Sequence, residues 1–185
     1  MERDIARILI TERQLAERVR TLATEITAAY PDRHDGLTLV TILSGSIIFL
    51  ADLIRQLPMR MKIGLVTVSS YPGASTSSVG PRLVGDLNVD VAGRDVLIVD
   101  DILDTGRTLR LVQQRLTALE AKSIRTVVVL RKPSKAPDDL VADFVGFDIE
   151  DEFVVGYGLD FNNQYRNLPQ IAVLKPELYA TATTT

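Results

Sequence analysis

The chain has 185 residues, of which 46% are hydrophobic and 24% are charged, with a formal net charge of −3 and no cysteine. This length and composition predict one globular domain with a sizeable core. The acidic balance gives no electrostatic reason to expect a nucleic-acid partner. The missing cysteines exclude disulfides and thiol catalysis, and the single histidine, His34, excludes a site built from several histidines.

The sequence shows neither the pattern of a secretory signal at its first residues nor an apolar stretch long enough to span a membrane. The first residues, Met1-Glu2-Arg3-Asp4, lack the basic and then apolar order of a secretory signal. The longest apolar stretch, 46–51, stops at Asp52 and is far shorter than the roughly 20 residues that span a bilayer. We therefore expect a cytoplasmic protein with no membrane partner.

The first third of the chain predicts a helix, a strand and a second helix. Thr11 and Gln14 have the spacing of a capping box, and apolar residues then follow at helical spacing. Residues 37–43, aliphatic except for Thr38 and Thr41, are typical of a buried strand, 44–46 form a tight loop, and 47–57 predict a helix. This order is a β-loop-α unit.

The middle of the chain predicts a long loop inside the domain. Residues 61–68 have strand character, and 69–81 are too rich in Ser, Gly and Pro for a packed element. Long loops in compact domains are often active-site lids, so we predict a lid here. Leu83-Val84 and Leu87–Val91 predict a short hairpin.

Strands alternating with helices in the second half predict an α/β fold with a mostly parallel sheet. Apolar runs at 96–99 and 124–130 predict two buried strands, and the spacing of the apolar residues from Leu109 to Leu119 predicts a helix between them. Shorter apolar segments, which we expect to lie partly in a small cap over the site, are 144–147, 153–155 and 171–174.

Val96–Leu109 is the most informative segment. An apolar strand ends in Asp100 and Asp101, a turn follows at Asp104-Thr105-Gly106, and a helix then begins. Ligands of open α/β sheets bind outside the carboxyl ends of strands, and free amides at a helix start favour an anion. Carboxylates beside a phosphate require a cation or sugar hydroxyls between them, and such oxygens suit Mg²⁺. The alternative is that these acids only end a strand and cap a helix.

This segment closely resembles the phosphoribosyl-diphosphate signature of the type I phosphoribosyltransferases. Four later segments resemble the hypoxanthine(-guanine) phosphoribosyltransferases in order and spacing, namely 129–133, 144–149, 153–162 and 165–169. The resemblance covers about residues 37–174 of a single domain, 1–185. It implies the type I fold, with a mostly parallel sheet flanked by helices and a small cap, or hood, built from parts of the N- and C-terminal segments.

The resemblance also implies the activity. The family transfers ribose 5-phosphate from phosphoribosyl diphosphate to N9 of hypoxanthine or guanine in purine salvage, releasing pyrophosphate with Mg²⁺ as cofactor. It implies a homodimer or homotetramer. Two readings stay open beside it: a xanthine- or hypoxanthine-preferring enzyme, and a non-catalytic nucleotide-sensing regulator of the same fold. The presence of Asp104, Lys132 and Asp160 argues against the regulator.

Residue roles follow from the same resemblance. Asp104 is the general base, Lys132 donates to the purine O6, and Phe153 stacks on the ring. The set that binds phosphoribosyl diphosphate is Ser44, Gly45, Ser70, Tyr71, Asp100, Asp101, Asp104, Thr105, Gly106, Arg107, Thr108 and Arg166. The purine set is Lys132, Phe153, Val154 and Asp160, and the metal set is Asp100, Asp101 and Asp160.

Two of these positions depart from the family's pattern. Ser44 stands where the family commonly has lysine, and Asp100 stands where it often has glutamate. The backbone amides of the Ser44 loop still suit pyrophosphate, and the peptide bond before residue 44 can be cis in the family. For Phe153 and Val154 the alternative role is core packing, and for Lys132 it is an ordinary solvated lysine.

Overall fold

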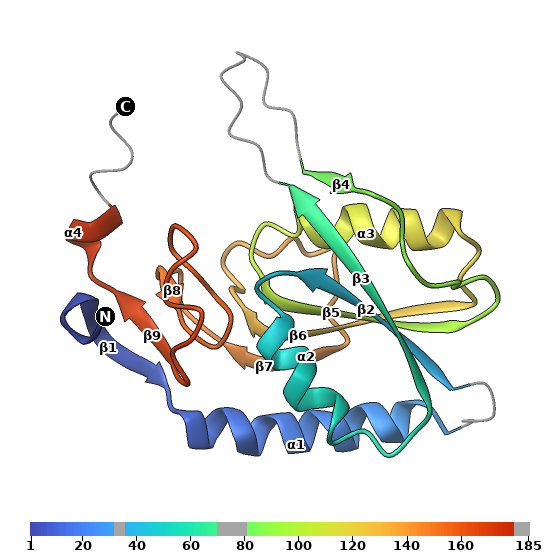
Figure 1. Ribbon diagram of the computed structural model, residues 1–185, viewed down its shortest axis with the longest axis horizontal. Coiled ribbons are helices and arrows are strands. Elements are labelled where there is room, and N and C mark those ends of the chain that lie inside the picture. Colours follow the sequence, from blue (N-terminus) through green and yellow to red (C-terminus); the bar gives the residue numbers. More distant parts are fainter. Residues whose placement is uncertain (32–35, 70–80, 180–185) are drawn as a thin grey trace, which may run out of the picture.

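The computed structural model describes residues 1–31, 36–69 and 81–179 (Figure 1). Several sequence-based expectations fall outside these ranges: the surface position of His34, the site residues Ser70 and Tyr71, most of the expected lid, and the tail from Thr181. Across the described residues, none of the helices has the length and apolar character needed to cross a membrane.

A six-stranded sheet forms the centre of the molecule, in the order β4-β3-β2-β5-β6-β7. Neighbouring strands are parallel except for β3 and β4, which are antiparallel. The strands are β2 (Leu37–Leu43), β3 (Met61–Ser69), β4 (Arg82–Val84), β5 (Asp95–Leu103), β6 (Ser123–Arg131) and β7 (Phe144–Asp148). Because the chain proceeds outward in opposite directions from β2 and β5, the switch point of the sheet lies between these two strands.

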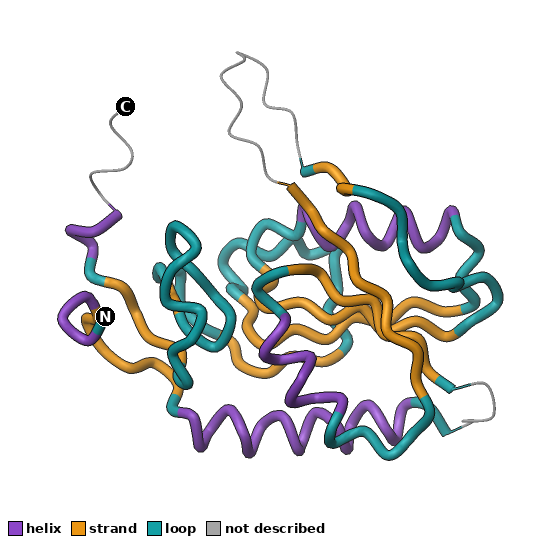
Figure 2. Tube along the Cα trace, in the orientation of Figure 1, coloured by secondary structure: helices purple, strands orange, loops and turns teal. Residues whose placement is uncertain are grey.

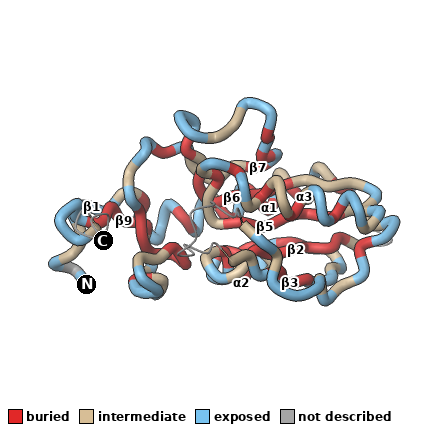
Figure 3. The backbone as a smooth tube through the Cα atoms, turned by 90° about the horizontal axis from the view of Figure 1, so that it is seen from above, coloured by how far each residue is buried: buried red, intermediate tan, exposed pale blue. Residues whose placement is uncertain are grey.

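Helices cover both faces of this sheet (Figures 1 and 3). Helices α1 (Glu12–Ala29) and α2 (Ile47–Ile54) pack with one set of strand side chains, and α3 (Arg107–Ala118) packs with the other set. The two sets alternate along each strand, as the period of two requires. The strands β2, β5 and β6 are consequently buried on both faces.

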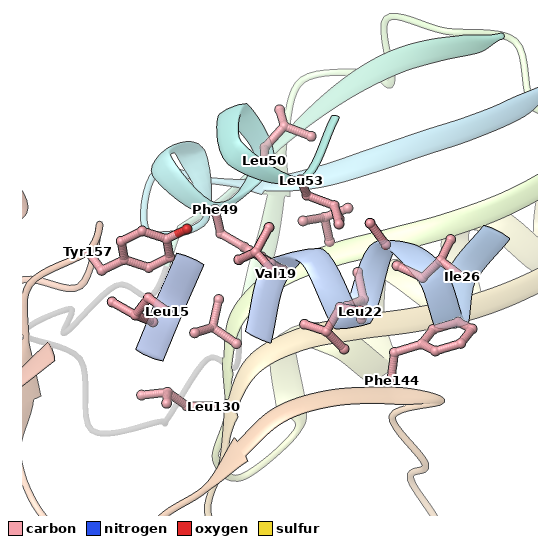
Figure 4. Close-up of a cluster of buried hydrophobic side chains, with 14 of the residues drawn as sticks. Leu15, Val19, Leu22, Ile26, Phe49, Leu50, Leu53, Leu130, Phe144 and Tyr157 are labelled. Carbon is pink, nitrogen blue, oxygen red and sulfur yellow. The ribbon is translucent and has the colours of Figure 1, made fainter. Parts of the chain in front are cut away.

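The core beneath α1 and α2 follows from the spacing of apolar residues on α1 (Figure 4). Thr11 and Gln14 form the expected capping box. The stripe after it is buried, and it meets Phe49 of α2, whose exposed fraction is 0%. Truncating such a ring typically costs about 3–5 kcal/mol of stability. The buried stripe is Leu15, Val19, Leu22, Ala23 and Ile26.

A second, antiparallel sheet forms the hood, in the order β1-β9-β8. Its strands are β1 (Ile5–Ile10), β8 (Val154–Val155) and β9 (Ile171–Leu174), flanked by the 3-10 helix η1 (Glu2–Asp4) and by α4 (Pro176–Tyr179). Figure 2 shows the segment between β8 and β9 as a long irregular loop. Segments from both ends of the chain thus build the hood, which confirms the expected fold class.

The structure differs from the sequence-based elements at three places. The expected hairpin is wrong, because β4 pairs with β3 while residues 87–91 form no strand. There the Asn88 side chain accepts a hydrogen bond from the Leu65 amide at 2.9 Å, in place of a backbone ladder. Helix α2 ends at Ile54 rather than at residue 57, and Pro58 disfavours helical backbone at Leu57, the residue directly before it. The strand β1 was not expected.

Candidate functional site

The candidate site lies at the switch point, outside the carboxyl ends of β2 and β5. A cavity of about 250 Å³ opens there. Two segments that are far apart in the sequence form most of its wall, the end of β2 with its following turn and the end of β5 with the start of α3. The lining residues are Ile42, Leu43, Gly45, Val68 and all of Asp100–Leu109.

The loop between β5 and α3 has the geometry of an anion cradle. Gly106 precedes the helix with φ of +69°, a left-handed conformation that favours glycine, and a Cβ at this position would overlap the Leu140 side chain. The helix then begins at Arg107, where the first amides have no partner within the helix. Thr105 and Thr108 line the same cavity and add hydroxyl groups. Amides and hydroxyls together suit a phosphate.

Asp100 and Asp101 place two carboxylates beside this cradle. Asp100 is buried, with an exposed fraction of 7%. Burial, reinforced by the neighbouring Asp101 charge, raises the pKa of Asp100 well above its usual range. Burial likewise raises the pKa of Asp101, although the Ile102 amide donates to its Oδ1 at 2.7 Å. Two crowded acids of this kind are stabilised in their charged form by a cation.

The turn after β2 approaches Asp101 closely. A Cβ built on Gly45 would overlap the Asp101 carboxylate, so only glycine fits the observed backbone. The Leu43–Ser44 peptide bond is cis, and the Ser44 side chain is exposed. Gly158 of the hood, with φ of +102°, also approaches this turn, since a Cβ on it would overlap the Gly45 carbonyl. The turn is therefore enclosed between a carboxylate and the hood loop.

Arg166 and Asp160 come to this side of the site from the loop between β8 and β9. The Arg166 guanidinium lies 2.8 Å from Asp160 Oδ1 and donates to the Gly158 carbonyl at 2.7 Å. Its positive charge also acts to lower the pKa of Asp101. Asp160 and Arg166 are outside the residues that line the cavity. They form its flank, with a cation facing the Asp101 carboxylate.

Lys132 follows β6 and joins Asp104 at the opposite flank. Its exposed fraction is 7%, and its Nζ lies 3.5 Å from Asp104 Oδ2. The Lys132 amide donates to the Leu103 carbonyl at 3.0 Å, which fixes the residue beside the end of β5. The other oxygen of Asp104, Oδ1, is buried without a hydrogen-bond partner. The Asp104 side chain as a whole is 34% exposed and lines the cavity, so its carboxylate is within reach of a bound ligand, from which it can accept a proton.

Phe153 lies on the hood with one ring face covered. The ring stacks on Tyr179 with centroids 4.8 Å apart and meets the edge of Phe161 at 5.5 Å. Its exposed fraction of 37% leaves surface for a ligand. The Val154 side chain is buried in the core, so the backbone is what this residue offers to a ligand. Val154 can therefore pack its side chain in the core and still present its backbone carbonyl to a ligand.

The structure thus brings most of the predicted residues to one region. Gly45 and the acids and cradle of residues 100–108 line one cavity, while Lys132, Asp160 and Arg166 flank it. Within the described ranges, no cluster of three or more His, Asp or Glu side chains has the arrangement of a complete metal site. Sequence reasoning missed Asp151, whose Oδ1 lies 3.0 Å from Lys132 Nζ. The acidic run at 148–152 contains this residue but does not single it out.

Comparison with known proteins agrees with this architecture. The model of the family described as "Phosphoribosyl transferase domain" matches residues 8–162, and the chain belongs to this family. A curated protein of Bacillus subtilis named hypoxanthine-guanine phosphoribosyltransferase is 42% identical over 97% of this chain and 98% of its own length. The bifunctional protein TilS/HprT of Listeria innocua is also 42% identical, but the chain spans only 28% of that protein.

A solved structure shows the same fold. The crystal structure of a hypoxanthine phosphoribosyltransferase from Staphylococcus aureus superposes with a TM-score of 0.89 at 40% identity, covering 97% of this chain and 96% of that chain. Because the superposition covers nearly the whole of both chains, the likeness extends over the central sheet and the hood together.

Proposed function

We propose that this chain is a hypoxanthine-guanine phosphoribosyltransferase of purine salvage, with residues 1–185 forming a single domain. It transfers ribose 5-phosphate from phosphoribosyl diphosphate to N9 of hypoxanthine or guanine and releases pyrophosphate. The observation that carries the proposal is that the anion cradle and the partly exposed Asp104 carboxylate line one cavity. The full-length similarity to the Bacillus subtilis enzyme supports the same reaction.

The proposed roles divide the substrates between the two flanks of the cavity. Residues 104–108 bind the 5′-phosphate through amides and hydroxyls. The Ser44-Gly45 turn and Arg166 bind the pyrophosphate, which leaves with negative charge that the Arg166 guanidinium offsets. Ser70 and Tyr71, outside the described residues, are proposed to close over the reacting centre and exclude water.

The purine binds on the Lys132 side. Lys132 donates to O6, Phe153 stacks on the ring, and the main-chain carbonyls of Val154 and Asp160 accept from a 2-amino group. Asp104 then takes the ring proton as N9 bonds to C1′. Adenine is rejected because its 6-amino group cannot accept the Lys132 hydrogen bond.

Mg²⁺ is the proposed cofactor, and the donors present suit it. Asp100, Asp101 and Asp160 would hold the ion, since carboxylate oxygens are its preferred protein ligands and substrate phosphates complete its shell. Bound Mg²⁺ would neutralise charge on the diphosphate. Its proposed place explains why the Asp100 and Asp101 carboxylates are tolerated next to a phosphate site.

The test is a transferase assay on the purified protein with phosphoribosyl diphosphate, Mg²⁺ and each of hypoxanthine, guanine, xanthine and adenine. We expect turnover with hypoxanthine and guanine and none with adenine. Preference for xanthine, or for hypoxanthine without guanine, would favour the narrower enzyme. Nucleotide binding without turnover on any base would favour the non-catalytic regulator.

We further propose a cytoplasmic homodimer or homotetramer. Exposed apolar side chains support an assembly surface: Ile47 and Ile48 of α2, and Ile63 and Leu65 of β3. Ile63 and Leu65 lie on the sheet face that α2 also covers, because they pair in register with Leu39 and Thr41. Analytical ultracentrifugation of the intact chain tests this, and a monomer at micromolar concentration would contradict it.

A further inference from the structure

The Lys132 ammonium is buried and faces two acids. Its backbone is fixed, because its amide donates to Leu103 and its carbonyl accepts from the amides of Lys135 and Ala136. The position of the ammonium group therefore depends on the conformation of the Lys132 side chain. A buried ammonium is costly unless it is paired, so the carboxylate that holds it decides where the charge lies.

The two acids hold this ammonium unequally. Asp151 Oδ1 accepts a hydrogen bond from Lys132 Nζ at 3.0 Å, whereas Asp104 Oδ2 is 3.5 Å away with no hydrogen bond between them. Lys135 Nζ lies 2.9 Å from the same Asp151 oxygen, which fixes that carboxylate from a second side. Asp151 is therefore the dominant partner of Lys132.

The loop that carries Asp151 is anchored on both sides. Before it, the Ile149 amide donates to the Arg131 carbonyl at 2.9 Å, and Arg131 forms a bidentate pair with Asp148 at 2.7 and 2.9 Å. After it, Glu152 pairs with Arg7 of the hood strand β1. The position of Asp151 is thus set by the sheet and the hood together, independently of the Asp104 loop.

We propose that Asp151 is a positioning residue for purine recognition: it holds the Lys132 ammonium where O6 of the base arrives and keeps it off the Asp104 carboxylate. The inference rests on the proposed function and deepens it. With Lys132 held in this way, the Asp104 carboxylate accepts no hydrogen bond from the ammonium and stays available to a ligand. Without Asp151, the Lys132 ammonium would turn to Asp104, its other acidic neighbour. It would then no longer lie where O6 of the purine arrives, and it would pair with the carboxylate that is proposed to act as general base.

The kinetic test compares Asp151→Asn, Asp151→Glu and the control Glu150→Gln, which removes an exposed carboxylate of the same loop. For Asp151→Asn we expect the KM for hypoxanthine to rise at least tenfold, with the KM for phosphoribosyl diphosphate within twofold of wild type. Asp151→Glu restores at least part of the loss, and Glu150→Gln matches wild type. An unchanged hypoxanthine KM, or an equal rise in both KM values, overturns the proposal.

A second measurement needs no activity. A double-mutant cycle of Asp151→Asn and Lys132→Met, followed by thermal unfolding, gives the coupling between the two side chains. We expect Asp151→Asn to lower Tm more in the wild-type chain than in Lys132→Met, where only the Lys135 partner of Asp151 remains, and additive shifts overturn the pairing. A wild type inactive on every purine would reject the proposed function, while this cycle would still decide the role of Asp151.

Discussion

The Asp101 carboxylate occupies the space in which a side chain at Gly45 would lie. One residue follows the end of β2 and the other lies near the end of β5, so this contact joins the two halves of the switch point. Gly158 approaches the Gly45 carbonyl from the hood. The turn that is proposed to bind pyrophosphate is thus shaped by the carboxylate that is proposed to hold the metal.

Gly45→Ala tests this dependence. The added methyl group would displace either Asp101 or the turn, because the two cannot share the observed space. We expect kcat/KM for phosphoribosyl diphosphate to fall at least tenfold, while the hypoxanthine KM changes much less. Steady-state kinetics with each substrate varied in turn measures the effect. If Gly45→Ala had the kinetics of the wild type, the turn would accommodate a side chain and the contact between Gly45 and Asp101 would have no role.

Asp104→Asn tests the general base. The amide keeps the shape of the side chain but cannot take the ring proton, so kcat should fall by about 100-fold or more. The KM for phosphoribosyl diphosphate should change only modestly. Asp86→Asn, at an exposed acid paired with Arg115, serves as the control and should keep wild-type turnover. Near-normal turnover in Asp104→Asn would remove Asp104 from this role.

The site residues that could be predicted from the sequence lie close together along the chain. Asp100, Asp101 and Gly106 lie within one strand-turn-helix unit, so their neighbourhood follows from chain order. The contact between Asp151 and Lys132 joins two loops whose separation depends on the pairing of β6 with β7. Nothing in the run 148–152 tells which acid points inward. The hairpin expected at 83–91 failed for a similar reason, because β3 offered a better partner to β4.

Lys132→Ala tests purine selection. Loss of the ammonium removes the donor to O6, so the KM for hypoxanthine should rise and discrimination against adenine should weaken by about tenfold or more. The comparison of kcat/KM for the two bases measures this. If hypoxanthine and adenine are discriminated as before, O6 is recognised by another group.

Tyr179→Ala tests the support behind Phe153. Tyr179 stacks on this ring with an interplanar angle of 22°, and such pairs contribute about 0.5–1.5 kcal/mol beyond buried area. Removing the ring frees Phe153 to move, so the KM for hypoxanthine should rise a few fold with little change for phosphoribosyl diphosphate. Tyr179→Phe keeps the stack and is the matched control. Equal kinetics in both variants would show that Phe153 needs no support from α4.

Asp95 gives a pH-dependent prediction for the stability of the sheet. The Ser123 hydroxyl donates to its Oδ1 at 2.6 Å and Lys122 pairs with Oδ2 at 3.1 Å, and these partners lower the pKa of Asp95. A lowered carboxyl pKa adds stability above the unfolded value of about 3.9, and that stability is lost as the pH falls through the folded value. Asp95→Asn should therefore lower the free energy of unfolding at pH 7 by about 1 kcal/mol.

The corresponding fall in Tm is about 2–4 °C for a chain of this size. The difference between Asp95→Asn and wild type should be full at pH 7 and shrink steadily below about pH 4, where the wild-type carboxylate becomes protonated. Calorimetry of the two proteins at pH 7 and at pH 3 measures this difference in Tm. Asp138→Asn, at an exposed position, controls for the change in net charge. A Tm difference that is the same at pH 7 and at pH 3 would mean that the charged form of Asp95 does not stabilise the junction between β5 and β6.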